Sequence, residues 1–144
     1  MLVYEGTKLD FSNSVKRGTI ADEVELCLLE RLGRHTARAE INSWTHSLQS
    51  MNAVLSDMGI PDDVGVAIEY NIPQTSKRVD FIISGYDKAG KPNAIVIELK
   101  QWTEIEAVDG LDALVRTFTG GIRQTVVHPS YQAWSYAALI QEYI

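Results

Sequence analysis

Three charged residues in the middle of the chain have the types and spacing that suggest chemistry: Asp80, Glu98 and Lys100. Each lies in a segment of strand-forming residues, where Asp, Glu and Lys are uncommon. Close carboxylates repel each other and raise each other's pKa, and a divalent cation reverses that cost. Such a cation can polarise a phosphodiester and activate a water molecule, while an ammonium group stabilises the charge that develops on the phosphate. The three residues therefore predict a metal-dependent nuclease site that uses Mg²⁺, with Mn²⁺ as a substitute.

An antiparallel meander of three predicted strands positions these residues. The strands cover residues 64–72, 78–85 and 94–101, with turns at 73–76 and 87–92. If the second hairpin is centred on Ala89, Asp80 faces Glu98, and Lys100 lies on the same face two residues further on. The core would then occupy the opposite face, through Val79, Phe81, Ile83, Ile95, Ile97 and Leu99.

A third acid joins the row if the first hairpin is centred between Gln74 and Thr75. Glu69 then faces Asp80 from the other side and serves as a further metal ligand. The competing interpretation makes Glu69 a solvated partner of Lys100 or Arg78. A slip of one residue in either hairpin would break the row.

Helices are expected on both sides of the meander. They are predicted at about 19–32, 37–58 and 110–119 and from 128 to the C-terminus, with a short strand at 2–4. Gly120 and Gly121 are expected to interrupt the third of these helices. The fold class is therefore α/β, more closely α+β, in one domain over residues 1–144.

Composition supports a globular enzyme. The chain has 144 residues, 45% of them hydrophobic, and a net charge of −6. The negative balance counts against a module that grips nucleic acid over its whole surface, but it suits clustered carboxylates that hold a metal. No segment resembles a membrane span or a secretory signal, and the lone Cys27 cannot form an internal disulfide. We expect a cytoplasmic protein with no membrane partner.

The two motifs resemble the signature of the PD-(D/E)XK nuclease superfamily. They are residues 78–82 (Arg-Val-Asp-Phe-Ile) and 97–101 (Ile-Glu-Leu-Lys-Gln), although Val79 stands where the motif often has Pro. Gln132 and Tyr136 match the Gln-x-x-x-Tyr motif of its RecB and lambda-exonuclease branch, and at this spacing they share a helix face. The resemblance implies a restriction-endonuclease-like core, Mg²⁺-dependent cleavage of DNA, catalytic roles for Gln132 and Tyr136, and the carbonyl of Leu99 as a metal ligand.

A narrower resemblance covers nearly the whole chain. Segments 3–7, 32–35, 72–81, 98–102 and 128–134 resemble the N-terminal region of a bacterial family of uncharacterised P-loop ATPase/helicase-like proteins. That family implies an ATPase domain as a partner in the parent protein. This chain has no Gly-x-x-x-x-Gly-Lys-Ser/Thr loop, and the final core strand of the superfamily is not evident. We therefore expect a nuclease-like module that belongs to a longer protein.

Other interpretations stay open at this point. Gln132 and Tyr136 could pack the last helix on the sheet, and Glu25 could face the site or solvent. The histidines lack the spacing of metal ligands, and the tryptophans are expected in or near the core. The alternative function is a catalytically silent module that binds DNA or a protein partner.

Overall fold

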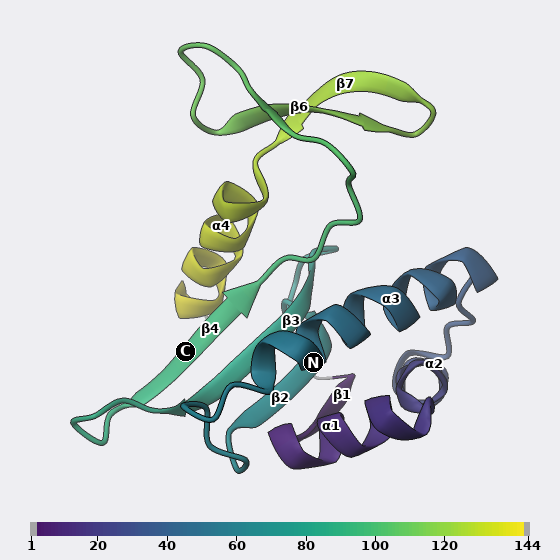
Figure 1. Ribbon diagram of the computed structural model, residues 1–144, viewed down its shortest axis with the longest axis vertical. Coiled ribbons are helices and arrows are strands. Elements are labelled where there is room, and N and C mark those ends of the chain that lie inside the picture. Colours follow the sequence, from purple (N-terminus) through teal and green to yellow (C-terminus); the bar gives the residue numbers. More distant parts are fainter. Residues whose placement is uncertain (1–2, 143–144) are drawn as a thin grey trace.

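A four-stranded antiparallel sheet carries helices on both of its faces (Figure 1). The structure is a computed structural model that describes residues 3–142, and its fold is α+β. The strands lie in chain order: β1 (Tyr4–Thr7), β2 (Gly65–Asn71), β3 (Arg78–Tyr86) and β4 (Pro92–Ile97). One face is covered by α1 (Lys8–Arg17), α2 (Ile20–Leu32) and α3 (Arg38–Leu55), and the other by α4 (Pro129–Glu142).

The predicted meander is confirmed, including its register. Phe81 pairs with Ile68 on one side and with Ile97 on the other, as both assumed hairpin centres require. The third strand ends earlier than predicted, at Ile97. Glu98 and Lys100 therefore follow the strand and lie in irregular backbone.

The alternation of side chains changes phase in the middle of β2 and β3. Glu69 has a φ of 59°, a left-handed conformation that is rare for a residue with a side chain. Phe81 packs against the face of α1 to α3, whereas Val79 packs with Tyr136 of α4. The predicted common face of Val79 and Phe81 is therefore wrong, because the regular period of two does not continue through this point.

Helix α1 is a feature that the sequence pattern did not predict. Thr7 and Asp10 form a capping box: the Thr7 hydroxyl accepts from the Asp10 amide at 3.1 Å, and the Asp10 carboxylate accepts from the Thr7 amide at 3.0 Å. Helix α2 and α3 lie close to their predicted ranges, and α3 ends three residues before 58. The strand predicted at 2–4 lies instead at Tyr4–Thr7, and residue 2 is outside the described residues.

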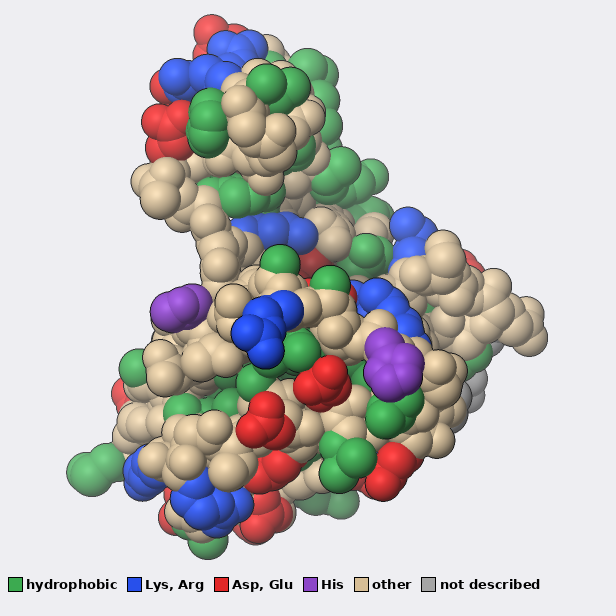
Figure 2. Space-filling view, turned by 90° about the vertical axis from the view of Figure 1, so that its right-hand side faces the viewer, with side chains coloured by type: hydrophobic (Ala, Val, Ile, Leu, Met, Phe, Trp, Pro, Cys, Tyr) green, Lys and Arg blue, Asp and Glu red, His purple; other side chains and the backbone are tan. Residues whose placement is uncertain are grey.

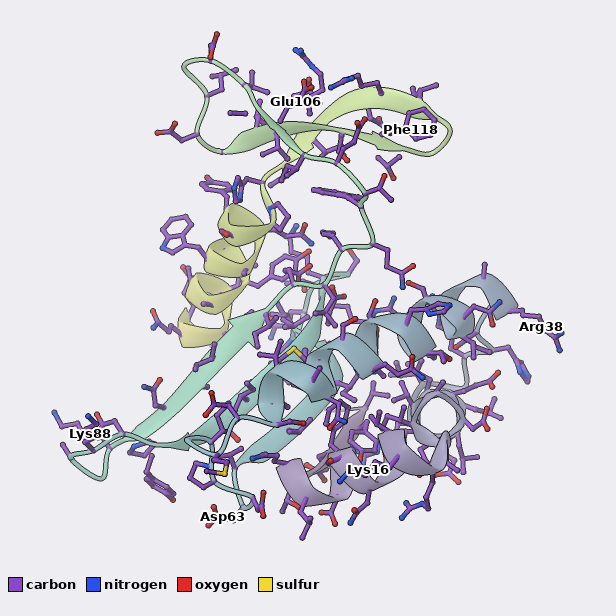
Figure 3. The ribbon with its side chains drawn as sticks, in the orientation of Figure 1. Lys16, Arg38, Asp63, Lys88, Glu106 and Phe118 are labelled. Carbon is purple, nitrogen blue, oxygen red and sulfur yellow. The ribbon has the colours of Figure 1, made fainter. Side chains whose placement is uncertain are left out.

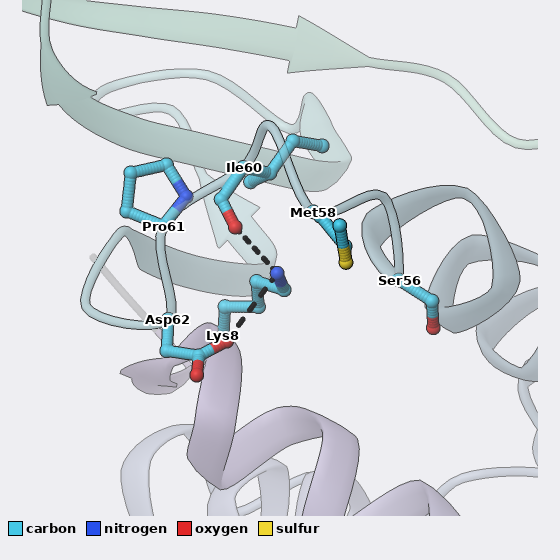
Figure 4. A pocket seen from close by; sticks show the side chains of 6 residues that line it. All are labelled: Lys8, Ser56, Met58, Ile60, Pro61 and Asp62. Carbon is cyan, nitrogen blue, oxygen red and sulfur yellow. Dashed lines mark hydrogen bonds and ion pairs between the residues drawn. The ribbon is translucent and has the colours of Figure 1, made fainter.

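A buried lysine joins α1 to the loop between α3 and β2 (Figure 4). Lys8 is 8% exposed, and its ammonium donates to the carbonyl oxygens of Ile60 and Asp57 and pairs with Asp62 at 3.3 Å. The surrounding depression measures about 390 Å³. Because the three donor positions of the ammonium are matched by three partners in this loop, the cluster is a structural connection between α1 and the loop before β2.

A second, three-stranded sheet projects from the rest of the molecule (Figures 1 and 3). We call it the arm; it consists of β5 (Glu106–Ala107), β6 (Leu114–Thr119) and β7 (Ile122–Val127). The helix predicted at 110–119 is therefore wrong. Gly120 and Gly121, with φ of 62° and 82°, form the two-residue turn between Thr119 and Ile122 that a tight β-hairpin requires. Among the described residues no helix is both long and apolar enough to span a membrane.

Candidate active site

Asp80 lies on β3, one residue beyond the end of its pairing with β4. Its Oδ2 atom accepts a hydrogen bond from the amide of Leu99 at 2.9 Å. This bond lies beyond the end of the ladder, because the pairing of β3 with β4 ends at Phe81 and Ile97. The irregular backbone after Ile97 thus places its amide against the Asp80 carboxylate, next to Glu98.

The Glu98 carboxylate is buried, and its two oxygen atoms differ in their hydrogen-bond partners. Its side chain is 2% exposed. Its Oε2 atom accepts from the Gln132 amide at 2.8 Å and lies 3.6 Å from the Lys100 ammonium. Within the described part of the chain, its Oε1 atom is buried and has no hydrogen-bond partner. A buried acceptor of this kind costs free energy unless a ligand satisfies it.

The environment of Glu98 also changes its acidity. Burial and, to a smaller extent, the negative charge of Asp80 raise the pKa of Glu98 to about 7, although the charge of Lys100 opposes the shift. Perturbed pKa values are frequent at functional sites, but structural networks of charged groups shift pKa values as well, so the geometry has to decide. The same repulsion would be relieved by a divalent cation between the two groups.

Helix α4 brings the Gln-x-x-x-Tyr pair to the site, as the spacing predicted. The Nε2 atom of Gln132 lies within hydrogen-bond distance of Glu98 and, at 3.1 Å, of the Tyr136 hydroxyl. Tyr136 is 9% exposed and packs against Ile72 and Val79. The Lys77 ammonium lies 5.6 Å from the centre of its ring. Tyr136 therefore helps to pack the last helix on the sheet, as one interpretation predicted, while Gln132 reaches the Glu98 carboxylate and its catalytic role stays a prediction.

Gln101 is a positioning residue that sequence reasoning did not single out. Its Nε2 atom donates to the Ser43 carbonyl at 2.7 Å and to the Ser47 hydroxyl at 3.1 Å. These bonds tie the segment after β4 to α3 and so fix the backbone that carries Glu98 and Lys100. Its place directly after the Glu-x-Lys motif is the signal that could have identified it.

Glu69 is not brought to the carboxylate pair, although it has the predicted register position opposite Asp80. Its Oε1 atom accepts from the Trp44 indole at 3.0 Å, and its Oε2 atom pairs with the Arg78 guanidinium. Arg78 also binds Glu40 at 2.8 Å. The left-handed backbone of Glu69 accompanies this orientation. Asp80 and Glu98 therefore remain as a pair of candidate ligands, while Glu69 belongs to an ion-pair network close enough to Asp80 for that charge to raise its pKa.

The remaining candidates lie elsewhere. Glu25 is on α2, which packs against α1, α3 and β1, and no hydrogen bond or ion pair of the described residues joins it to Asp80 or Glu98. His128 accepts from the Ser130 amide at 3.0 Å and so helps to begin α4. Trp44 is buried as expected, but Trp134 is 64% exposed, and the centre of its ring lies 5.5 Å from the centre of the Tyr131 ring.

The donor set fits magnesium with two carboxylates. Within residues 3–142 no group of three or more His, Cys, Asp or Glu side chains is placed to hold a metal. Mg²⁺ commonly keeps several waters and takes one or two carboxylates, which Asp80 and the unpartnered oxygen of Glu98 can supply. Leu99 contributes its amide to Asp80, and its carbonyl stays a predicted ligand.

Comparison of the chain with models of known protein families, with curated proteins and with solved structures finds no match. The assignment of chemistry therefore depends on the geometry of the site itself.

Proposed function

We propose that this chain is a metal-dependent nuclease domain of the PD-(D/E)XK type that hydrolyses phosphodiester bonds in DNA. The observation that carries the proposal is the buried Glu98 carboxylate, which has one oxygen bound by Gln132 and near Lys100 and the other without a partner, beside the Asp80 carboxylate. Buried polar atoms without any partner are uncommon in native proteins, and the corresponding oxygen of Glu69 at least has the Arg78 cation beside it. At Glu98 one oxygen is left for a ligand that is absent from the protein's own contacts.

Each side chain has a definable task in this reaction. Mg²⁺ held by Asp80 and Glu98, with the Leu99 carbonyl as a further predicted ligand, would supply an activated water and a polarised phosphate. Lys100 places a positive charge next to the carboxylates, where it can stabilise the charge that develops on the phosphate. Gln132 fixes the orientation of Glu98, and Tyr136 holds Gln132 in place through α4. Together they keep the ligand oxygens in one geometry before substrate arrives.

The wider role is part of the same proposal. A domain of this kind would act on DNA in the cytoplasm, within a larger protein whose ATPase or helicase-type domain supplies the motor. The support for this is the resemblance of segments along the chain, since the domain itself contains no phosphate-binding loop. DNA repair or defence against foreign DNA would suit such a machine.

The proposal is tested by cleavage of single- and double-stranded DNA with Mg²⁺ or Mn²⁺. Lys100→Ala is expected to lower the cleavage rate by about 10²–10³-fold, the usual effect of removing one group that stabilises developing charge. Lys88→Ala is the control, because Lys88 lies at the tip of the β3–β4 hairpin, far from α4 (Figure 3). Equal cleavage by wild type and Lys100→Ala, or no cleavage by either, contradicts the proposal.

A second candidate function is a silent nuclease-fold module that binds DNA or a protein partner. The observation that favours it is the pair of carboxylates where three were predicted, since Glu69 is held by Trp44 and Arg78. Calorimetry separates the two functions. If the module is silent, titration with Mg²⁺ or Mn²⁺ gives either no heat of binding or a heat that Asp80→Asn leaves unchanged. If it is a nuclease, the wild type binds the ion and Asp80→Asn removes the heat.

A further inference from the structure

A depression of about 240 Å³ lies beside Lys100, between α3 and the segment that follows β4. Its lining is His46, Ser47, Ser50, Leu99, Lys100 and Gln101. None of these residues is acidic, although the chain as a whole has a net charge of −6. The depression is therefore a locally favourable place for an anion on a protein that repels anions overall.

The depression is held open by bonds that leave donors available. Gln101 uses its amide nitrogen for the Ser43 carbonyl and the Ser47 hydroxyl, which fixes the two walls relative to each other. The Ser47 oxygen accepts in this bond, so its own proton can be donated to a ligand. The Ser50 hydroxyl donates at 3.2 Å to the His46 carbonyl, an exposed bond that a stronger acceptor can replace at little cost.

The chemistry of the lining suits a phosphate and its sugar. Lysine and serine side chains are common donors to phosphate oxygens in contacts with nucleic acid, and an imidazole carries a further N–H donor. The lining contains no Phe, Tyr or Trp side chain, so it lacks the large aromatic surfaces on which bases usually stack. Its volume is below the roughly 300–1,000 Å³ of pockets that enclose whole drug-sized ligands. A single backbone unit of a nucleic-acid strand fits these limits.

Lys100 connects this depression with the carboxylate pair. It lines the depression, and its ammonium lies 3.6 Å from Glu98 Oε2. Figure 2 shows that the molecule is hollowed between the arm and the rest of the molecule and that basic and acidic side chains lie next to each other in the hollow. A strand whose scissile phosphate lies at Asp80 and Glu98 would therefore continue past Lys100 onto the face of α3.

We propose that the depression of His46, Ser47, Ser50 and Lys100 binds the backbone phosphate that neighbours the scissile one. The inference rests on the proposed nuclease function and specifies how its substrate is held. It predicts that one phosphate next to the scissile one contributes to the affinity for DNA by binding side chains of α3. Sequence information plays no part, because the contacts reach only phosphate and sugar.

The test combines charge removal on the protein and on the DNA. A fluorescent single-stranded oligonucleotide is titrated by anisotropy with Ca²⁺ in place of Mg²⁺, and a series carries one methylphosphonate linkage at successive positions. With wild-type protein, one position is expected to weaken binding by about tenfold, equivalent to about 1.4 kcal/mol. With the His46→Ala, Ser50→Ala double variant, binding of the unmodified DNA weakens about as much, and the methylphosphonate at that position has no further effect.

The control variant is Gln49→Ala, because Gln49 is an exposed residue of α3 that does not line the depression. It is expected to retain wild-type affinity and the wild-type methylphosphonate pattern. Independent, additive losses in the double variant, or no binding of DNA by the wild type, would overturn the subsite. Cleavage of the unmodified DNA in Mg²⁺ is measured in parallel, because its absence contradicts the nuclease proposal while the binding cycle still reports on the subsite.

Discussion

Glu69 and Glu98 both have almost completely buried side chains, but Glu69 is bound by a residue of α3 and Glu98 by a residue of α4. The side chain of Glu69 is 4% exposed and that of Glu98 is 2% exposed. Burial raises the pKa of each to about 7. Glu69 accepts a hydrogen bond from the Trp44 indole on one oxygen, and its other oxygen, which has no hydrogen-bond partner, forms an ion pair with the Arg78 guanidinium. Glu98 has partners on one oxygen only.

The difference shows why burial and a raised pKa do not by themselves identify a functional carboxylate. Both groups incur the same kind of desolvation cost. At Glu69 an ion pair within the fold offsets that cost, and Glu40 extends the network. The charge of Asp80 adds to the cost at both groups, but at Glu98 a lysine 3.6 Å away opposes it and one oxygen has no hydrogen-bond partner. Glu98 is therefore the better placed of the two to bind a cation from outside.

The largest expected effect separates the two glutamates by activity. Glu98→Gln is expected to lower the rate of DNA cleavage in Mg²⁺ by about 10³-fold, or about 4 kcal/mol, because the site loses a ligand charge. Glu69→Gln keeps the shape of the side chain away from the site and is expected to change the rate less than threefold. Both rates are measured under saturating Mg²⁺, with circular dichroism as a check of folding. A comparable loss in both variants would place Glu69 in the site.

The next effect separates them by stability. Arg78→Ala leaves the Glu69 carboxylate buried without its cation and is expected to lower the free energy of unfolding by about 3 kcal/mol. The value is at the lower end of the range for broken buried pairs, because Glu69 can take up a proton near neutral pH. Urea denaturation measures the change.

The matched control for this substitution is Arg17→Ala. Arg17 is 62% exposed and pairs with Glu23 at 3.6 Å, so its removal is expected to cost less than about 1 kcal/mol. Similar losses for Arg78→Ala and Arg17→Ala would show that the Glu69 network contributes no more than a surface pair.

The smallest effect is a dependence of stability on pH. In the folded protein Glu69 and Glu98 retain protons at pH values where the unfolded chain, with an ordinary pKa near 4.5, has lost them. Stability should therefore fall as the pH rises from about 4.5 to about 7, by about 2 kcal/mol for each group once the full shift is reduced for screening by solvent. Urea denaturation in metal-free buffer at pH 5 and pH 8 measures this loss.

The contributions of Glu69 and Glu98 to this pH dependence can be separated with single variants and with Mg²⁺. Glu69→Gln and Glu98→Gln should each remove part of the slope. Mg²⁺ should reduce the slope in wild type and in Glu69→Gln but leave it unchanged in Glu98→Gln, because only Glu98 has an oxygen free for the cation. A Mg²⁺ response that survives in Glu98→Gln would mean that the ion binds elsewhere.

Local pattern was sufficient to predict the meander and the last helix. Strand-forming segments between clear turns set the register that pairs Phe81 with Ile97, and the Gln132–Tyr136 spacing placed both side chains on one face. The same kind of reasoning fails in the arm, where it predicts a helix over residues 110–119 and the structure has strand β6. Alternating strand residues around Gly120-Gly121 are the hairpin signal that was available there.

The sequence by itself determined that Asp80, Glu98 and Lys100 lie together, because hairpin register follows from the turns and the period of two. Only the tertiary structure decided that Glu69 leaves the row. Its orientation depends on a left-handed backbone and on partners about 25 residues away in α3 and across the sheet at Arg78, which no local pattern encodes. The unsatisfied oxygen of Glu98 likewise depends on how α4 and the end of β4 pack, since burial is a property of the assembled fold.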